Sequence, residues 1–151
     1  MKIRRSISAD YKDLLSFLKR AFDEMGYEFL PDGKDADIRD IDRVYARGRG
    51  SFYVVDDQGR ICGCIGLRAW SDDTAELKRL YLAPECRGRG IGHELCVSVI
   101  NDARNLGYRL IRLDTTAKSP AALALFRKLG FYEIARYNAN PLAELFLEKT
   151  L

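Results

Sequence analysis

The stretch "RLYLAPECRGRGIGHELC", residues 79–96, carries the strongest structural signal in this chain. Its first residues are typical of a strand, and the residues after Gly90 begin an apolar stripe with helical spacing. Between them lies the loop Arg87-Gly88-Arg89-Gly90-Ile91-Gly92. A chain that leaves a strand and enters a helix exposes unpaired N–H groups at the positive end of the helix dipole. We therefore expect residues 87–92 to bind a bulky anion, with the glycines letting the backbone approach it.

Two familiar phosphate loops do not fit this stretch. No GxxxxGK[ST] run exists in the chain, and Gly88-x-Gly90-x-Gly92 lacks the GxGxxG spacing of a dinucleotide fingerprint. The letters RGRG also occur at residues 47–50, but there they follow a helical pattern and precede the strand-like "SFYVV". We predict that those glycines end the helix in a left-handed conformation and have no binding role.

Working outward from the loop, hydrophobic patterning predicts a mixed α/β fold in the order β-α-α-β-β-β-α-β-α-β-β. Helices are expected at residues 8–26, 37–47, 92–107 and 119–130. Strands are expected at residues 1–7, 51–57, 60–70, 74–84, 108–115, 131–137 and 143–151. No linker or repeat interrupts the pattern, so we expect residues 1–151 to form a single domain with helices on both faces of the sheet.

Composition narrows the class of protein. The net charge of +3 does not indicate a nucleic-acid partner, and no apolar run approaches the roughly 20 residues that span a bilayer. With a charged N-terminal segment, these features favour a cytoplasmic protein without a membrane partner. The four cysteines form no CxxC pair and His93 is alone, so no metal is expected. Cys62 and Cys64 should be free thiols on one face of a core strand.

The loop resembles the acyl-CoA-binding signature of the GNAT (Gcn5-related) N-acetyltransferases, [RQ]-x-x-G-x-[GA], with Arg87, Gly90 and Gly92 at the specified positions. The later segment "ALALFRKLGF" and the order of strands and helices also match those of the family, so the resemblance covers nearly the whole chain. "AELKRLYL", "RLDT", the LGF of residues 129–131 and "YNANP" resemble a bacterial subgroup of small-molecule type.

This resemblance implies a sheet splayed open between its fourth and fifth strands, with acetyl-CoA as co-substrate in the cleft. Backbone groups of Leu80, Tyr81 and Leu82 would pair with the pantetheine arm. The pyrophosphate would lie on the N–H groups of Arg87, Gly88, Arg89, Gly90, Ile91 and Gly92. Ser119 stands where many members have a cofactor-binding asparagine, although it could equally serve as a helix N-cap. Phe126 would line the cofactor site where many members have a tyrosine acid.

Glu76 matches the position of a glutamate base in some branches of this family. Strand alternation predicts that it shares a face with Lys78, Leu80 and Leu82. The alternative is a surface cross-strand ion pair with Lys78 or a neighbour. Since Phe126 cannot be an acid, Tyr81, Tyr132, Tyr137 or water remain open for that role.

Arg79, Tyr137 and Asn140 are the candidates for binding the acceptor, together with Arg68. Arg79 is predicted on the face opposite Glu76, where its guanidinium would suit a carboxylate. The resemblance favours a small-molecule amine, such as an amino acid. A protein N-terminus or lysine as acceptor, and a non-catalytic acyl-CoA-binding module, remain alternatives. An exposed strand edge could also pair with a second copy, so a homodimer is one expectation.

Overall fold

The computed structural model describes residues 1–151, and the predicted mixed α/β fold is confirmed. The strands are β1 (Lys2–Arg5), β2 (Ser51–Asp57), β3 (Arg60–Ala69), β4 (Thr74–Leu82), β5 (Leu110–Thr115), β6 (Tyr132–Ile134) and β7 (Leu145–Thr150). The helices are α1 (Tyr11–Met25), α2 (Ile91–Asn105) and α3 (Pro120–Lys128). The predicted second helix is instead a 3-10 segment, η2 (Ala36–Asp40), followed by a π-helical segment, η3 (Asp42–Ala46). Short 3-10 turns precede α1 (η1, Ser8–Asp10) and α2 (η4, Pro84–Cys86).

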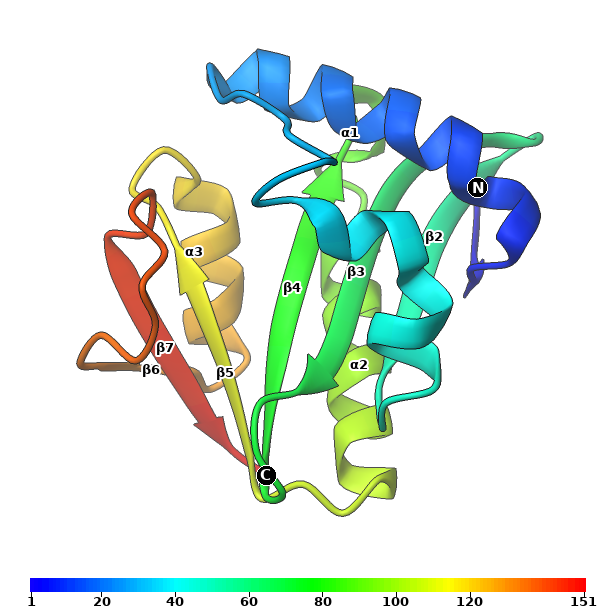
Figure 1. The fold of residues 1–151 in the computed structure, drawn as a ribbon. Helices are drawn as coiled ribbons and strands as arrows, with labels where there is room; N and C mark the ends of the chain where they lie inside the picture. The colour runs from blue at the N-terminus through cyan, green and yellow to red at the C-terminus, as the bar shows by residue number, and fades with distance from the viewer.

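One seven-stranded sheet, in the order β1-β2-β3-β4-β5-β7-β6, organises the molecule. Every neighbouring pair is antiparallel except β4 and β5, which are parallel. Figure 1 shows α1 and the η2–η3 segment on one face, and α2 and α3 on the other. No helix is long and apolar enough to span a membrane.

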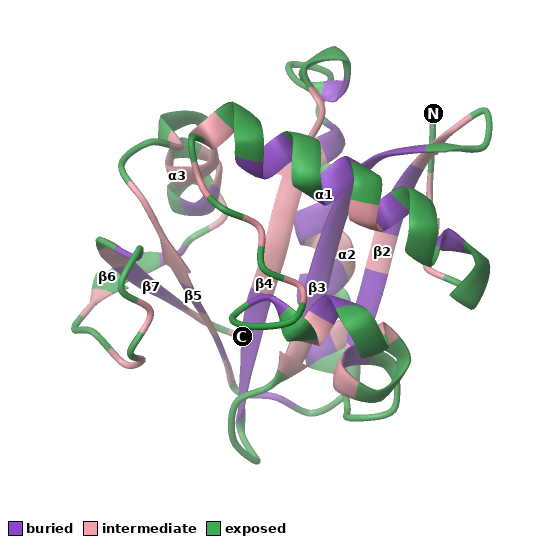
Figure 2. Cartoon of the chain, turned by 45° about the horizontal axis from the view of Figure 1, so that its top comes forward, coloured by how far each residue is buried: buried purple, intermediate pink, exposed green.

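Each face of the sheet has its own core. The α2 and α3 face packs around Leu95, Val99 and Phe126, and the α1 face packs around Leu14, Leu18 and Tyr45. Buried segments accordingly concentrate on the central strands and on the inward sides of the helices (Figure 2). All four cysteines are free and buried, as predicted. The prediction that Cys62 and Cys64 share a face is wrong, because a register shift after Val55 places them in opposite cores.

The sheet is splayed between β4 and β5, as the family resemblance implied. These strands pair only over Thr74–Glu76 and Leu110–Arg112, and no pairing follows as they run on toward Leu82 and Thr115. In Figure 1 the two strands diverge from their common start into a V. The edge of β4 that faces β5 is therefore free of a strand partner over its second half.

A β-bulge in β4 changes which side chains share a face. Arg79 has a left-handed φ of 61°, and the pairing with β3 shifts between Cys64 and Gly66. Leu80 and Leu82 consequently pack in the α2 core, whereas Tyr81 packs in the α1 core. The predicted common face for Glu76, Lys78, Leu80 and Leu82 is therefore wrong. The bulge also turns Arg79 toward η2, on the same side as Glu76 and not opposite to it.

The RGRG stretch at residues 47–50 lies at the turn between η3 and β2, as predicted, but its geometry differs from the prediction. The left-handed residue is Arg49, with a φ of 56°, and not a glycine. Gly50 is required for another reason, since an added Cβ would lie 2.0 Å from the carbonyl oxygen of Leu67. Arg49 donates to the carbonyl oxygens of Asp72 and Leu106 and lies over the ring of Tyr108. These contacts hold the turn against the ends of β3 and α2.

Candidate active site

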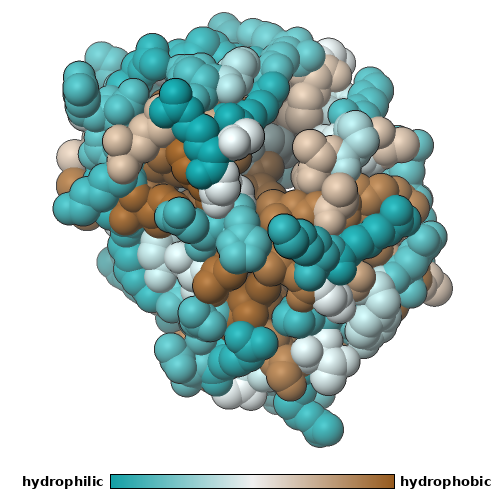
Figure 3. Space-filling view, turned by 180° about the vertical axis from the view of Figure 1, so that it is seen from behind, coloured by the Kyte–Doolittle hydropathy of each residue, from teal (hydrophilic) through white to brown (hydrophobic).

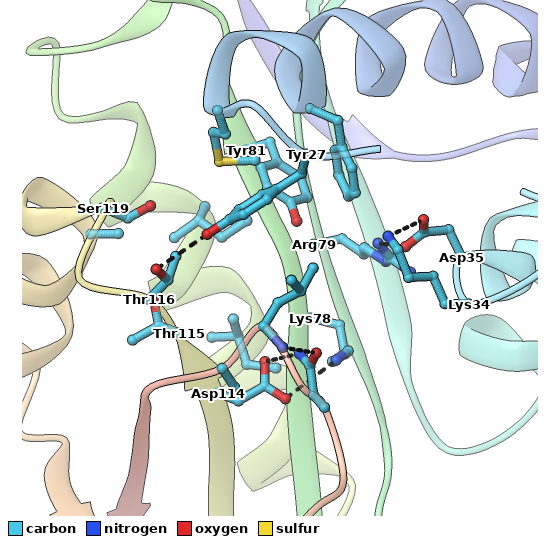
Figure 4. A pocket seen from close by; sticks show the side chains of 18 of the residues that line it. Tyr27, Lys34, Asp35, Lys78, Arg79, Tyr81, Asp114, Thr115, Thr116 and Ser119 are labelled. Carbon is cyan, nitrogen blue, oxygen red and sulfur yellow. Dashed lines mark hydrogen bonds and ion pairs between the residues drawn. The ribbon is translucent and has the colours of Figure 1, made fainter. Parts of the chain in front are cut away.

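A cleft of about 330 Å³ opens where β4 and β5 diverge. Its walls come from the second half of β4, the end of β5, α3, the segment after α1 and the loop before β7 (Figure 4). Half of its lining residues are hydrophobic, and the others include the charged Lys34, Asp35, Lys78, Arg79 and Asp114. The cleft thus combines an apolar wall with a charged floor, as small-molecule sites commonly do.

The loop that leads into α2 presents free backbone donors. Gly88 and Gly90 have φ angles of 70° and 80°, in the left-handed region that glycine tolerates. The N–H groups of Gly88, Arg89 and Gly90 lie outside the helices and strands and have no hydrogen-bond acceptor in the protein. The first turn of α2 adds the unpaired donors found at any helix start. No atom lies within 4 Å of a Cβ built at Gly88 or Gly90, so the loop has room for a pyrophosphate.

Gly92 has a different task from the other two glycines. A Cβ at this position would lie 3.4 Å from the side chains of Leu82 and Leu125. The first turn of α2 therefore packs closely against both β4 and α3. That packing fixes the direction in which the free N–H groups of the loop point.

The two arginines of the loop are in different environments. Arg87 forms two hydrogen bonds with the carboxylate of Glu24 in α1, and its Nε donates to the carbonyl oxygen of Leu82. Arg89 is exposed and has no partner within the protein. Arg87 therefore ties the loop to its surroundings, and Arg89 leaves its full charge at the rim.

Four of the eleven residues predicted to contact the cofactor lie together in the cleft. Leu80, Tyr81, Ser119 and Phe126 all line the cleft. Ser119 is at the N-cap position of α3, yet its hydroxyl makes no capping bond, so the group is free toward the cleft (Figure 4). Phe126 is 3% exposed and packs edge-on against Phe131.

Glu76 does not line the cleft. Its side chain is fully buried, and one carboxylate oxygen accepts a hydrogen bond from Arg68, its cross-strand partner on β3. The other oxygen accepts from the Tyr137 hydroxyl at 2.7 Å. The alternative of a cross-strand ion pair with Lys78 or a neighbour is thus confirmed with Arg68 as the partner, but the pair is buried and not at the surface. Glu76 holds Tyr137 and Arg68 in place behind the cleft.

The residues predicted to bind the acceptor differ in their access to the cleft. Arg79 lines the cleft, but its guanidinium is occupied by Asp35 and Asp37, with Nη1 2.9 Å from Asp35 Oδ1. Tyr137 points to Glu76 and packs against Trp70 and Phe146, outside the cleft wall. Asn140 lines the cleft and donates to Asp114. A carboxylate ligand would therefore have to displace two aspartates to reach Arg79.

Of the tyrosines left open as acids, only Tyr81 lines the cleft. Burial raises the pKa of Tyr81 to about 12, although the charge of Arg79 acts in the opposite direction. Tyr132 is on the outer strand β6, bonded to Glu148. The hydroxyl of Tyr137 donates to Glu76, and burial raises its pKa well above the ordinary range of tyrosine.

Sequence reasoning missed Asp114 and Tyr27 as site residues. Asp114 lies at the end of β5, where Asn138 and Asn140 donate to its two oxygens at 2.6 and 3.3 Å. Tyr27 reaches across the cleft from the end of α1, and its hydroxyl lies 3.3 Å from Thr116 Oγ1 (Figure 4). Asp114 lies in "RLDT", at a strand end where polar residues commonly serve a site, and that signal could have identified it.

The face formed by α2 and α3 is partly apolar. Figure 3, viewed from this side, shows a band of hydrophobic surface flanked by hydrophilic side chains. Leu82, Leu123 and Leu125 are only half buried on this face. Leu82 and Leu125 lie next to Gly92 at the end of the glycine loop, so this surface suits a ligand that joins an apolar arm to a charged phosphate.

Comparison with known proteins agrees with this geometry. The profile of the acetyltransferase (GNAT) family matches residues 12–131. The uncharacterized N-acetyltransferase YjgM of Escherichia coli is 31% identical over 66% of this chain and 62% of its own length. The N-acetylaspartate synthetase of Danio rerio is 34% identical over 74% of this chain and 43% of its own length. The chain therefore aligns with less than two thirds of either relative.

Solved structures share the fold. A GNAT acetyltransferase from Staphylococcus aureus has a TM-score of 0.91 at 22% identity, covering 99% of this chain and 98% of its own. The ribosomal-protein-alanine N-acetyltransferase of Brucella melitensis has a TM-score of 0.79 at 25% identity, with all of both chains covered. A phosphinothricin acetyltransferase from Sinorhizobium meliloti, solved with acetyl-CoA, has a TM-score of 0.80 at 21% identity over 99% of this chain and 88% of its own. Together with the splayed sheet and the glycine loop, the family match establishes that this chain belongs to the GNAT acetyltransferase family.

Proposed function

We propose that this chain transfers the acetyl group of acetyl-CoA to a primary amine of a small molecule. The observation that carries the proposal is the path along the chain from the free N–H groups of residues 88–90 back to the unpaired edge of β4, which lines the cleft at Leu80 and Tyr81. This path has an anion site at one end and an open pocket at the other. Its chemistry matches a ligand with a pyrophosphate, an extended arm and a reactive end.

In this proposal the cofactor is held mainly by backbone. Residues 87–92 bind the pyrophosphate, with Arg89 adding charge at the rim. The edge of β4 at Leu80, Tyr81 and Leu82 pairs with the amide groups of the pantetheine arm, as an added strand would. Ser119 and Phe126 form the facing wall. The Sinorhizobium neighbour solved with acetyl-CoA supports the choice of ligand.

Acetyl-CoA, when bound, supplies the thioester carbonyl that a neutral amine attacks. A C–N bond forms and the C–S bond breaks. The proton lost by nitrogen is balanced, through solvent, by the proton that the CoA thiolate gains. The α-amino group of a peptide N-terminus, with a pKa near 8, is about 10% neutral at pH 7, whereas a lysine is below roughly 0.1%. Transfer to a more basic amine therefore depends more on removal of a proton before attack.

The departing thiolate needs no tyrosine in this proposal. Its conjugate thiol has a pKa near 8.5, so the thiolate is a good leaving group. Tyr81, with a pKa of about 12, is a poor donor to such a group. Water is left as the proton source, and Glu76 acts as a positioning residue behind the cleft, since it has no access to the acceptor.

A protein N-terminus is the second candidate acceptor. The specific observation in its favour is the fold shared with the Brucella ribosomal-protein-alanine N-acetyltransferase. The name of the Danio relative favours an amino acid instead, since N-acetylaspartate is the product it denotes.

The proposal is tested by measuring CoA thiol release with acetyl-CoA and a panel of amino acids, polyamines and peptides with free N-termini. Release that depends on a free amine, with the acetylated product identified by mass spectrometry, is the expected result. Tight acetyl-CoA binding without turnover of any amine would instead identify an acyl-CoA-binding module. Faster turnover of the peptides than of any free amino acid would establish the second candidate.

A further inference from the structure

We propose that Lys78 and Asp114 form the acceptor site, and that they select a zwitterion with adjacent ammonium and carboxylate groups, the head of a free α-amino acid. The inference rests on the proposed acetyl transfer, because the same cleft is used. Asp114 would bind the ammonium, which loses one proton to solvent before the nitrogen attacks the thioester, and Lys78 would bind the carboxylate. This assignment replaces Arg79 as the carboxylate-binding residue.

The position of the pair follows from the splay of the sheet. The last paired residues of β4 and β5 are Glu76 and Arg112. Lys78 and Asp114 each lie two residues farther along, so their side chains fall on the same face at the fork of the V. They form the floor of the cleft in Figure 4, below the wall assigned to the cofactor arm. An amine bound there lies at the end of the path along β4.

Lys78 is the one cation of the cleft that lacks a hydrogen-bond acceptor. Lys34 donates to the carbonyl oxygen of Glu28 at 2.8 Å and to Asp35 at 2.7 Å. Arg79 is bonded to two aspartates. The ammonium of Lys78 approaches only Asp114, at 3.8 Å, which is beyond hydrogen-bonding distance. With 18% of its side chain exposed, it retains three donors directed at the cleft.

Asp114 is the matching anion. The other carboxylate of the cleft, Asp35, already accepts from Lys34, Arg79 and the N–H group of Leu30. Asp114 accepts only from the neutral amides of Asn138 and Asn140, one at each oxygen. Those amides fix the orientation of the carboxylate without neutralising its charge. Each oxygen keeps a lone pair for a ligand.

A zwitterion fits such a pair better than a simple amine does. The two charges of an α-amino acid are adjacent, as are those of Lys78 and Asp114 at 3.8 Å. With its ammonium on Asp114 and its carboxylate on Lys78, the ligand replaces the long contact between these two side chains by two charge-assisted hydrogen bonds. A polyamine or a peptide N-terminus has no carboxylate beside its amine, so it would leave Lys78 without a partner in a largely buried site.

The test measures binding and turnover separately. Isothermal titration of the protein–CoA complex compares proteinogenic L-amino acids with their α-carboxamides, which keep the ammonium and lose the carboxylate charge. CoA release with acetyl-CoA is measured for the same compounds. The variants are Lys78→Met, Lys78→Arg and Asp114→Asn, and Lys19→Met is the control, because that lysine is exposed on α1 and does not line the cleft. Melting temperature and acetyl-CoA affinity establish that each variant is folded.

At least one amino acid is expected to bind about 10- to 100-fold more tightly than its carboxamide, the range for a hydrogen bond between charged groups. Lys78→Met should abolish the preference for the amino acid and leave the affinity for the carboxamide unchanged. Lys78→Arg should keep most of the preference. Asp114→Asn should weaken the binding of the amino acid and of its carboxamide by the same factor. Lys19→Met should leave the ratio of the two affinities as it is. Equal binding of acid and carboxamide by the wild type, or an unchanged ratio in Lys78→Met, overturns the inference. Selective binding without any CoA release would overturn the proposed transfer reaction and leave the zwitterion site standing.

Discussion

Arg87 of the phosphate loop and Glu24 of α1 are joined by two parallel hydrogen bonds, of 2.7 and 2.8 Å. The pair links residues 63 positions apart and holds the guanidinium beside the free N–H groups of the loop. The arginine of the family signature is therefore oriented before any ligand arrives. The carboxylate that orients it also cancels part of its charge.

Glu24→Gln should consequently raise the affinity for acetyl-CoA. The amide can still accept one hydrogen bond from Arg87, but a negative charge near the pyrophosphate is gone. We expect the Kd to fall about two- to fivefold at low ionic strength and the gain to vanish near 0.5 M salt, because exposed charges are screened. Titration at several salt concentrations measures this. Asp23→Asn removes the same charge one residue away, so an equal gain in that variant would argue against a specific role for the pair.

Gly90→Ala should weaken acetyl-CoA binding at least about tenfold. The added Cβ projects into the space assigned to the pyrophosphate, and a φ of 80° costs a non-glycine residue ~1 kcal/mol. Gly107→Ala is the matched control, because Gly107 has a φ of 84° and open space at the other end of α2. Both variants should lose similar thermal stability. Only Gly90→Ala should lose affinity, and a parallel loss in Gly107→Ala would mean that binding merely follows stability.

Asp37→Asn should destabilise the fold by about 3 kcal/mol, since it removes one partner of a buried ion pair. Burial raises the pKa of Asp37, but the hydrogen bond and charge of Arg79 outweigh this and hold the pKa below its ordinary value. The carboxylate thus contributes stability above the unfolded pKa near 4, and the contribution is lost as pH falls through the folded value.

Urea unfolding should therefore show the gap between wild type and Asp37→Asn narrowing as pH falls from about 7 to about 3. Asp42→Asn is the control, because its ion pair with Arg47 lies at exposed positions, and we expect less than about 0.5 kcal/mol from it. A gap that stays constant with pH would show that the carboxylate charge of Asp37 is not what stabilises the fold.

Tyr81→Phe should keep kcat within about threefold of wild type. Transfer of a proton from a phenol with a pKa of about 12 to a thiolate with a conjugate pKa near 8.5 is uphill by about 5 kcal/mol. Steady-state kinetics with a reactive amine provide the measurement, with the KM for acetyl-CoA as a check on the cleft wall. A hundredfold loss of kcat at an unchanged KM would establish Tyr81 as the acid after all.

Local signals account for the parts of this fold that the sequence predicted. The glycine loop at residues 87–92 needs only a preceding strand, a following helix and residues that tolerate a positive φ, all of which are visible in one short segment. Gly26 and Gly107 end α1 and α2 with left-handed φ angles of 73° and 84° for the same reason. The order of strands and helices follows from such signals in turn.

The floor of the cleft was not predictable in this way. The bulge at Arg79 puts a bulky residue at a positive φ, and its side chain bonds Asp35 and Asp37, more than 40 positions earlier in the chain. Strand alternation cannot anticipate such a shift, so Glu76 was predicted to share a face with Leu80. Asp114 and Lys78 become neighbours only because β4 and β5 pair in parallel, a contact without a local sequence signal.

Three residue pairs, from Thr74–Leu110 to Glu76–Arg112, are the entire ladder between the two halves of the sheet. Beyond them the amide protons on the open edge of β4 are exposed to exchange with solvent deuterium in the free protein. A ligand arm that bonds to this edge would slow that exchange at residues near Leu80–Leu82 and leave the β2–β3 ladder unaffected. The cofactor would then occupy the position of an eighth strand. The rate at which β4 and β5 move apart would set how fast it binds and dissociates.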